Sequence, residues 1–202
     1  MCGRYYIDDE TAREIDKLVR KIDENLKNSN DAGIMLTGRD VHPNDLAPIL
    51  IADGQGELRC HQQRWGFPGF KGKQVIFNAR SETVLEKKMF RQNMDYRRAV
   101  VPATWFYEWD QNKEKHLFYR KDQPIVFMAG IYGCFDEERF TILTTAANES
   151  MEPVHNRMPV ILDSNELMEW TTNREWAINH LHKKPCRLDR KTEFEQIKLF
   201  DI

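Results

Sequence analysis

The sequence predicts an α+β protein: a single domain whose β-rich centre forms a barrel-like or strongly bent sheet, with helices at its periphery. Two observations carry this prediction. From residue 98 onward, apolar, β-branched and aromatic runs alternate with polar turns. An amphipathic segment precedes this region, and two helix-like segments follow it. Since 202 residues suit one hydrophobic core, we expect one domain spanning residues 2–202.

The first elements follow from hydrophobic periodicity. Residues 2–7 predict a short strand, and DDETAREIDKLVRKIDENLKN predicts a helix for which Asp8 or Asp9 is a suitable N-cap. Apolar residues at helical spacing form one stripe along it: Ile15, Leu18, Val19, Ile22 and Leu26. Residues 28–45 are loop-like, and LAPILIADGQGELRCHQQRWGF predicts two strands around a DGQG turn.

The remaining elements are mostly strands. VIFNARSET predicts a strand leading into a helix that runs to about Arg91, with Ser81 as its N-cap. Strands are then expected in RAVVPATWFYEW, HLFYRK, PIVFMAGIYGCF, RFTILTTAAN and HNRMPVIL. The segments DSNELMEW and NREWAINHLHKK predict helices, and EFEQIKLFDI predicts a closing strand.

Composition narrows the function classes. The net charge of −2 gives no overall basic excess, so a site for a polyanion must be local. No window reaches 18 consecutive apolar residues, and no apolar segment follows the N-terminus; we therefore expect neither a membrane span nor a secretory signal, and a cytoplasmic location. His180, His182 and Cys186 lie close in HLHKKPC, but histidines two residues apart do not point toward a common position, so we expect no metal site there. We also expect no cofactor.

The N-terminus MCGRYY offers unusual chemistry. Methionine is commonly trimmed before a small residue, so we expect Met1 to be removed and Cys2 to become the first residue. Its α-amine and thiol would then sit on adjacent carbons as a 1,2-aminothiol. An α-amine titrates near ~7.7–8.0, against ~10.4 for lysine, so a useful fraction is nucleophilic at neutral pH.

Three further stretches set polar groups inside apolar runs: FNARSET, VPATWFYEW and EPVHNRMPVIL. Glu108 lies between two aromatic residues; it is either a water-facing edge carboxylate or a carboxylate in an apolar pocket suited to proton transfer. His155 is either structural or a site residue on a loop entering a strand. Asn78 also fits a turn or cap, and Arg80 also fits a surface ion pair.

Taken together, these blocks resemble the SOS-response-associated peptidase (SRAP) family, whose members shield abasic sites in DNA. The resemblance rests on MCGRY, NARSET at 78–83, VPATWFYEW at 101–109, FTILTTAAN at 140–148 and HNRMPVIL at 155–162, which come in the family's order. RWGF at 64–67 and VHPNDLAPIL around Pro43 fit less tightly. The chain departs from the family at Asp40, at Thr104-Trp105 and in the shortened WGFPGF block, where Phe70 replaces a Trp.

The resemblance implies a protein that binds single-stranded DNA at an abasic site and forms a covalent thiazolidine cross-link through Cys2. It implies that Glu108 and His155 act as acid and base and that Asn78 holds the terminal amine or the sugar. It further implies a DNA-binding set of Arg4, Arg80, Arg157, Trp65, Phe67, Met89 and Pro43, although helix packing explains Met89 equally well. We expect a monomer that joins the nucleoid when bound to DNA. The family name also implies peptidase activity, with self-removal of Met1 as one route.

Two other functions stay open from the residues. The first is a cysteine-type peptidase or amidase acting in trans, with Cys2 as nucleophile and His155 and Glu108 as base and orienter. The second is a non-catalytic nucleic-acid-binding module, in which Cys2 and Glu108 can be replaced without consequence.

Overall fold

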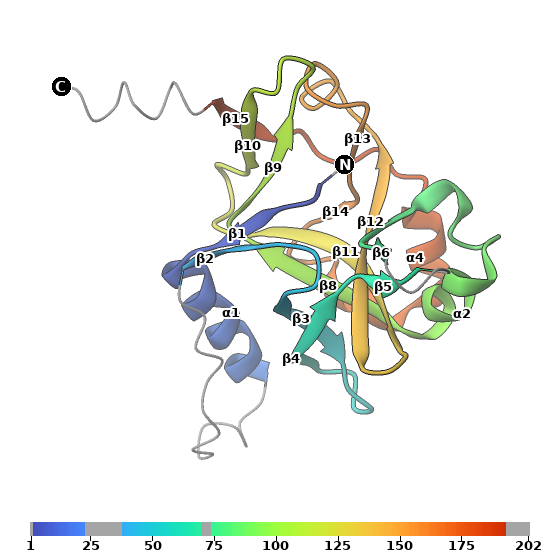
Figure 1. Ribbon diagram of the computed structural model, residues 1–202. Coiled ribbons are helices and arrows are strands. Elements are labelled where there is room, and N and C mark those ends of the chain that lie inside the picture. Colours follow the sequence, from blue (N-terminus) through green and yellow to red (C-terminus); the bar gives the residue numbers. More distant parts are fainter. Residues whose placement is uncertain (1, 23–37, 70–73, 193–202) are drawn as a thin grey trace.

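The centre of the protein is a closed ring of five strands. The computed structural model describes residues 2–22, 38–69 and 74–192. Neighbouring strands around the ring are β4 (Leu58–Trp65), β3 (Leu46–Ala52), β8 (Arg98–Ala103), β11 (Val126–Cys134) and β12 (Glu138–Ala146). The pairing of β11 with β12 and the parallel pairing of β12 with β4 close the ring (Figure 1). The predicted α+β fold with a barrel-like centre is therefore confirmed.

Short strands extend this ring at β12 and β11. The strands β13 (Arg157–Pro159) and β7 (Asn78–Arg80) pair with β12, and β14 (Ile161–Leu162) pairs with β11. Asn78 lies opposite Ile142 in the parallel β7–β12 pair. The ribbon of β5 (Phe67–Pro68) and β6 (Val75–Ile76) forms a separate sheet.

A second large sheet carries the N-terminal segment. Its strand order is β15 (Asp189–Thr192), β10 (Lys115–Tyr119), β9 (Trp105–Trp109), β1 (Tyr5–Ile7) and β2 (Arg39–Val41). Tyr5 faces Phe106 of β9 on one side and Val41 of β2 on the other. Because β1 is an interior strand, the residues just before it are drawn toward the strand that carries Glu108.

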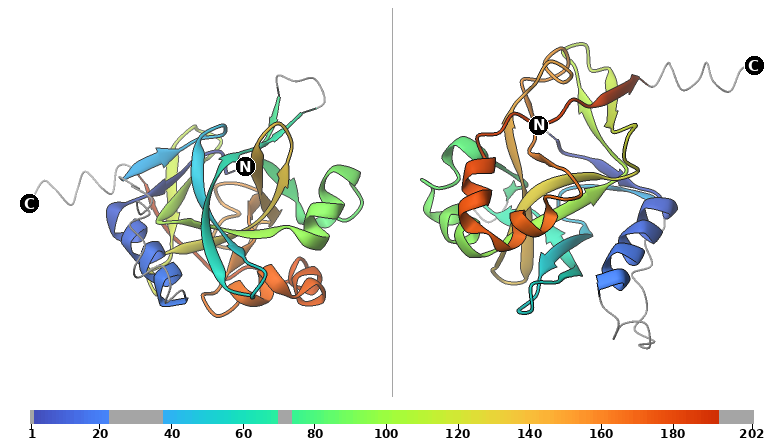
Figure 2. Two further views of the ribbon diagram at one scale, coloured as in Figure 1. Left: turned by 90° about the horizontal axis from the view of Figure 1, so that it is seen from below. Right: turned by 180° about the vertical axis from the view of Figure 1, so that it is seen from behind.

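Helices flank the strands, as predicted. Helix α1 (Asp9–Ile22) is capped by Asp8, whose Oδ1 accepts the Thr11 N–H at 2.6 Å. Helices α2 (Lys88–Tyr96), α3 (Leu167–Thr172) and α4 (Arg174–His180) lie on the side of the barrel away from α1 (Figure 2). No helix in the described ranges combines the length and apolarity that crossing a bilayer requires.

The core has two clusters of buried side chains. One surrounds the N-terminal segment and includes Cys2, Tyr5, Trp65 and Phe106. The other lies under α2, α3 and α4 and includes Phe90 and Trp170. Cys2 is thus part of the protein interior, with 1% of its surface exposed.

Several local predictions need correction or fall outside the described residues. Ser81 is not an N-cap: a 3-10 turn, η2 (Ser81–Thr83), begins there without a side-chain cap, and α2 starts at Lys88 and passes beyond Arg91. The first strand begins at Tyr5 rather than at residue 2. Of the predicted stripe on α1, Ile15 is buried. The side chains of Leu18, Val19 and Ile22, together with Leu26, Phe70 and the closing strand EFEQIKLFDI, lie outside what the structure describes.

Candidate functional site

Three contacts hold Cys2 and the residues after it. The Asn78 Nδ2 donates to the Cys2 carbonyl oxygen at 2.9 Å. The Tyr107 N–H donates to the Arg4 carbonyl oxygen at 3.0 Å, which joins the segment to β9. The Cys2 Sγ makes a weak hydrogen bond of 3.7 Å to the same Arg4 carbonyl. The backbone of Cys2 is thereby fixed between β7 and β9.

The surroundings of Cys2 keep its thiol neutral. Burial raises the pKa of the Cys2 thiol far above its usual range, and the negative charge of Glu108 raises it further. Glu108 is itself buried, with 3% of its surface exposed. Both the Cys2 thiol and the Glu108 carboxylate therefore lie in a region shielded from water. This excludes the water-facing interpretation of Glu108.

A cavity of about 750 Å³ adjoins this arrangement at Asn78. Its lining combines apolar and basic side chains: Ile76, Asn78, Ala79, Arg80, Lys87, Lys88, Met89, Phe90 and Phe135. Asn78 is half-buried and joins the two regions, since it lines the cavity and also contacts Cys2. The described lining does not include Cys2 itself.

His155 lies on the loop between β12 and β13, and this loop is anchored in the same core as Cys2. Met151 and Val154 of the loop belong to the cluster that contains Cys2, and the chain leading into β1 ends near this loop (Figure 1). The buried Asn148 at the start of the loop donates to the Pro185 and Cys186 carbonyl oxygens at 3.1 and 2.8 Å. These contacts fix the backbone that presents His155.

One hydrogen bond sets the tautomer of His155. Its Nδ1 accepts the backbone N–H of Arg157 at 3.0 Å. In the neutral ring the proton therefore resides on Nε2. In this neutral state the half-buried ring carries its N–H at Nε2, a group of the kind that hydrogen-bonds a sugar oxygen.

The three predicted arginines have different surroundings. Arg80 is exposed at the cavity rim and suits a phosphate contact. Arg4 lies over the rings of Tyr107 and Trp109, at 5.9 and 5.4 Å from their centroids, and its Nη1 is 3.8 Å from Asp40.

Arg157 already has a bidentate partner. Its Nη1 and Nη2 bind the Glu82 carboxylate at 2.6 and 2.9 Å, and Nη2 also donates to the Thr144 carbonyl oxygen at 2.6 Å. A phosphate would have to displace Glu82.

The structure contradicts two of the predicted base-stacking residues. Trp65 and Phe67 are both 0% exposed. Trp65 stacks on Phe140 and donates its Nε1 to the Phe77 carbonyl oxygen at 2.9 Å, so it is a core residue. Met89 does line the cavity while also packing against the core, and Pro43 is half-buried in the turn between β2 and β3.

The histidines of HLHKKPC do not gather around a metal position in the described structure. His180 stacks on Trp176 with ring centroids 4.6 Å apart, and its Nδ1 lies 3.9 Å from Glu166. The described residues instead contain one group of three potential ligands elsewhere, at Asp110, Glu114 and His116.

Sequence reasoning missed several residues of the cavity. Lys87 and Lys88 stand at its basic rim, and Phe135 reaches it from the turn between β11 and β12. The pair of lysines before an apolar helix start was visible in the sequence, but its position depends on the fold. Nothing in the sequence around Phe135 indicated that it lines a cavity, because its position near α2 depends on the closure of the barrel.

Comparison with known proteins adds the decisive observation. The profile of the family described as SOS response associated peptidase (SRAP) matches residues 1–198. The chain belongs to this family. The order of its blocks along the sequence therefore reflects membership rather than chance resemblance.

Relatives and solved structures agree with this assignment. The chain is 31% identical over 185 residues to the abasic site processing protein YoqW of Bacillus subtilis, covering 84% of this chain and 80% of that protein. It is 31% identical over 131 residues to the abasic site processing protein YedK of Escherichia coli, covering 60% and 59%. A crystal structure of a protein from Bacteroides thetaiotaomicron, 24% identical, has the same fold: the TM-score is 0.76 over 95% of this chain and 91% of that one.

Proposed function

We propose that this SRAP protein processes abasic sites in DNA by forming a covalent bond between Cys2 and the open-chain sugar of the lesion. The observation that carries the proposal is the setting of Cys2, which is held by Asn78 and electrostatically coupled to the buried Glu108. Two relatives of the chain are named abasic site processing proteins, which supports the same substrate.

The chemistry requires the free amine of Cys2, and therefore prior removal of Met1. The α-amine attacks the aldehyde carbon, and loss of one water gives an imine. The sulfur then adds to the imine carbon, its proton moves to nitrogen, and a five-membered thiazolidine closes. The sum is protein plus DNA minus one water. Because the second step is intramolecular, ring closure gains a large proximity advantage.

The neutral thiol suits this order of steps. With the thiol pKa raised by burial and by Glu108, little thiolate exists before the sugar arrives, so the amine reacts first. Glu108 would accept the proton that the thiol loses as sulfur attacks the imine and would pass it to the ring nitrogen. The Nε2–H of His155 would donate a hydrogen bond to the sugar ring oxygen and so favour the open aldehyde.

The cavity supports single-stranded DNA as the form bound. Its apolar residues Met89, Phe90 and Phe135 suit a nucleobase, and Arg80, Lys87 and Lys88 suit the flanking phosphates. An unpaired strand can turn a base into such a cavity without the cost of breaking a base pair.

The test uses an oligonucleotide with one abasic site. Wild-type protein should give a heat-stable band on a denaturing gel, with an intact mass equal to the protein without Met1 plus the DNA minus one water. Cys2→Ala keeps the amine but not the sulfur, so it should give a band only after borohydride reduction of the imine. Cys134→Ala, an exposed cysteine, is the matched control and should behave as wild type. A heat-stable band of equal strength from Cys2→Ala, or a cross-link that retains Met1, would refute the proposal.

A peptidase acting in trans has less support. A nucleophilic thiolate requires a lowered pKa, whereas the surroundings of Cys2 raise it. Self-removal of Met1 remains part of the proposal, because it is a single event that Glu108 could assist. Retention of Met1 in a Glu108→Gln variant, measured by intact mass in cells and in a purified translation system lacking aminopeptidase, would separate self-removal from trimming by another enzyme.

A further inference from the structure

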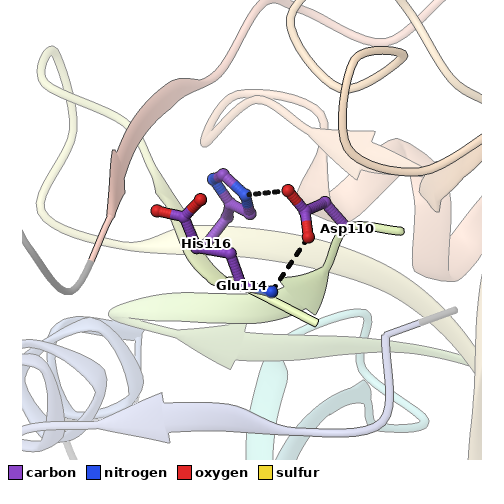
Figure 3. Close-up of side chains that lie close together, drawn as sticks. All are labelled: Asp110, Glu114 and His116. Atoms are coloured by element: carbon purple, nitrogen blue, oxygen red, sulfur yellow. Dashed lines mark hydrogen bonds and ion pairs between the residues drawn. The ribbon is translucent and has the colours of Figure 1, made fainter. Parts of the chain in front are cut away.

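Three potential metal ligands converge on the hairpin that joins β9 to β10. Asp110 follows β9, Glu114 precedes β10, and His116 lies within β10. One ligand atom from each residue lies within 4.8 Å of the corresponding atoms of the other two, and Figure 3 shows the His116 ring between the two carboxylates. The turn of the hairpin, closed by the Lys113 N–H donating to the Asp110 carbonyl oxygen at 3.0 Å, brings them together.

The His116 ring lacks the hydrogen bonds that a buried imidazole normally makes. Only 6% of His116 is exposed; within the described residues Nδ1 has no hydrogen-bond partner, and Nε2 has only the 3.5 Å contact with Asp110. A buried polar group left unsatisfied costs about 1–3 kcal/mol. The ring nitrogen nearest the cluster points at Asp110 (Figure 3). This buried side chain, oriented toward Asp110 and incompletely hydrogen-bonded, is an observation separate from the clustering of the acids.

The distance between His116 and Asp110 fits a shared ion better than a direct hydrogen bond. The Nε2 and Oδ2 atoms are 3.5 Å apart. Hydrogen bonds between such atoms are about 2.7–3.2 Å long. Two ligands bound at about 2.0–2.1 Å to one tetrahedral ion are separated by about 3.3–3.4 Å.

Asp110 is prepared for such a role. Its Oδ1 accepts the backbone N–H groups of Asn112 and Glu114, each at 2.9 Å, and Oδ2 is left facing His116. The backbone hydrogen bond from Glu114 first, then the contact with His116 and the backbone hydrogen bond from Asn112, lower the pKa of Asp110. They also fix its orientation, as outer contacts do for ligands in metal sites.

We propose that Asp110, Glu114 and His116 bind a divalent transition-metal ion such as Zn²⁺. One imidazole and two carboxylates are a common donor set for this class, whereas Mg²⁺ and Ca²⁺ prefer oxygen ligands alone. Glu114 is half-buried and needs only a side-chain adjustment to close the site. The ion would fix the hairpin whose first strand carries Glu108, since His116 lies directly opposite Glu108 in the β9–β10 register.

Cobalt titration of the full chain tests the site without reference to DNA chemistry. Co²⁺ should bind with one equivalent per chain, should be displaced by Zn²⁺ but not by Mg²⁺, and should give visible d–d bands without sulfur charge-transfer absorption. Asp110→Asn keeps the acceptor for the turn, and Glu114→Gln keeps the shape; each should weaken Co²⁺ binding at least tenfold while the circular dichroism spectrum stays unchanged. His182→Gln, in the other histidine-containing segment, is the matched control and should bind as wild type.

Each alternative outcome is informative. Unchanged affinity in both carboxylate variants, or no saturable binding, would overturn the proposal. Sulfur charge-transfer absorption, or weaker binding in His182→Gln, would move the ion to the segment of His182 and Cys186 and would equally overturn it. Because metal binding and DNA cross-linking are measured separately, failure of one proposal leaves the other standing.

Discussion

Replacing Tyr5 by Phe should make the protein more stable. The ring of Tyr5 is fully buried against Trp65, with centroids 5.1 Å apart. Its hydroxyl oxygen is buried as well, and no described residue hydrogen-bonds to it. Burial raises the pKa of Tyr5 well above its usual range, so the hydroxyl stays neutral. The wild-type protein therefore bears the cost of an unsatisfied polar group in its core.

The expected size follows from that cost. An unsatisfied buried hydroxyl destabilises a protein by about 1–3 kcal/mol. Removing it should therefore stabilise the protein, although the small void that is left offsets part of this gain. We expect Tyr5→Phe to raise the free energy of unfolding by about 1–2 kcal/mol. For a chain of this size, the melting temperature should rise by about 2–8 °C.

The assay is denaturant unfolding together with calorimetry. Tyr96→Phe is the matched control: its side chain is 76% exposed, so the same atom is removed from water and stability should change by less than about 0.5 kcal/mol. The rate of cross-linking should not change in Tyr5→Phe, because the hydroxyl has no part in the proposed chemistry. A variant less stable than wild type would show that the hydroxyl has a partner such as an ordered water, and would refute the reasoning.

Three further predictions concern the site and its support. Asn78→Ala removes the 2.9 Å hydrogen bond to the Cys2 carbonyl, which is worth about 1 kcal/mol. The rate of single-turnover cross-linking should therefore fall about fivefold or more, while DNA affinity stays the same. An unchanged rate would contradict the anchoring role of Asn78. Arg80→Ala should reduce the slope of log affinity against log salt concentration by about 0.7. Arg157→Ala should leave the slope unchanged, because its guanidinium is already paired with Glu82. Equal slopes in the two variants would argue against a phosphate contact made by Arg80 and not by Arg157. Glu82→Gln should cost under about 1 kcal/mol of stability at pH 7, because the carboxylate is partly exposed. The Arg157 hydrogen bond lowers the pKa of Glu82, so this contribution is present above about pH 4.3 and is lost as the pH falls through the folded-state pKa; a difference that persists at pH 2 would exclude the ion pair as its source.

The sequence predicted those features that depend on neighbours along the chain. The DGQG turn and its alternating flanks specified the β3–β4 hairpin, and the aspartate before an amphipathic stripe specified the start of α1. Cys2, Asn78 and Glu108 were selected as site residues from their blocks; the structure joins Asn78 to Cys2 by a hydrogen bond and buries Glu108.

Predictions failed where distant pairings decide. No local sequence pattern predicts that β12 pairs in parallel with β4 and β7. These pairings close the barrel and place Asn78 beside the N-terminal segment. Trp65 and Phe67 were expected from the family resemblance to contact DNA bases, but the closed barrel buries both. The grouping of Asp110, Glu114 and His116 was also missed, for a different reason. These residues are close in the sequence, but their convergence depends on the turn and register of the β9–β10 hairpin.

The depth at which Cys2 lies has a consequence for the lifetime of the protein in an oxidising cell. Peroxides attack thiolates that they can reach, and Cys2 is neither ionised nor accessible. Cys134, which is exposed, would meet the oxidant first. Cys2 would therefore stay reduced during oxidative stress, as the proposed cross-linking chemistry requires.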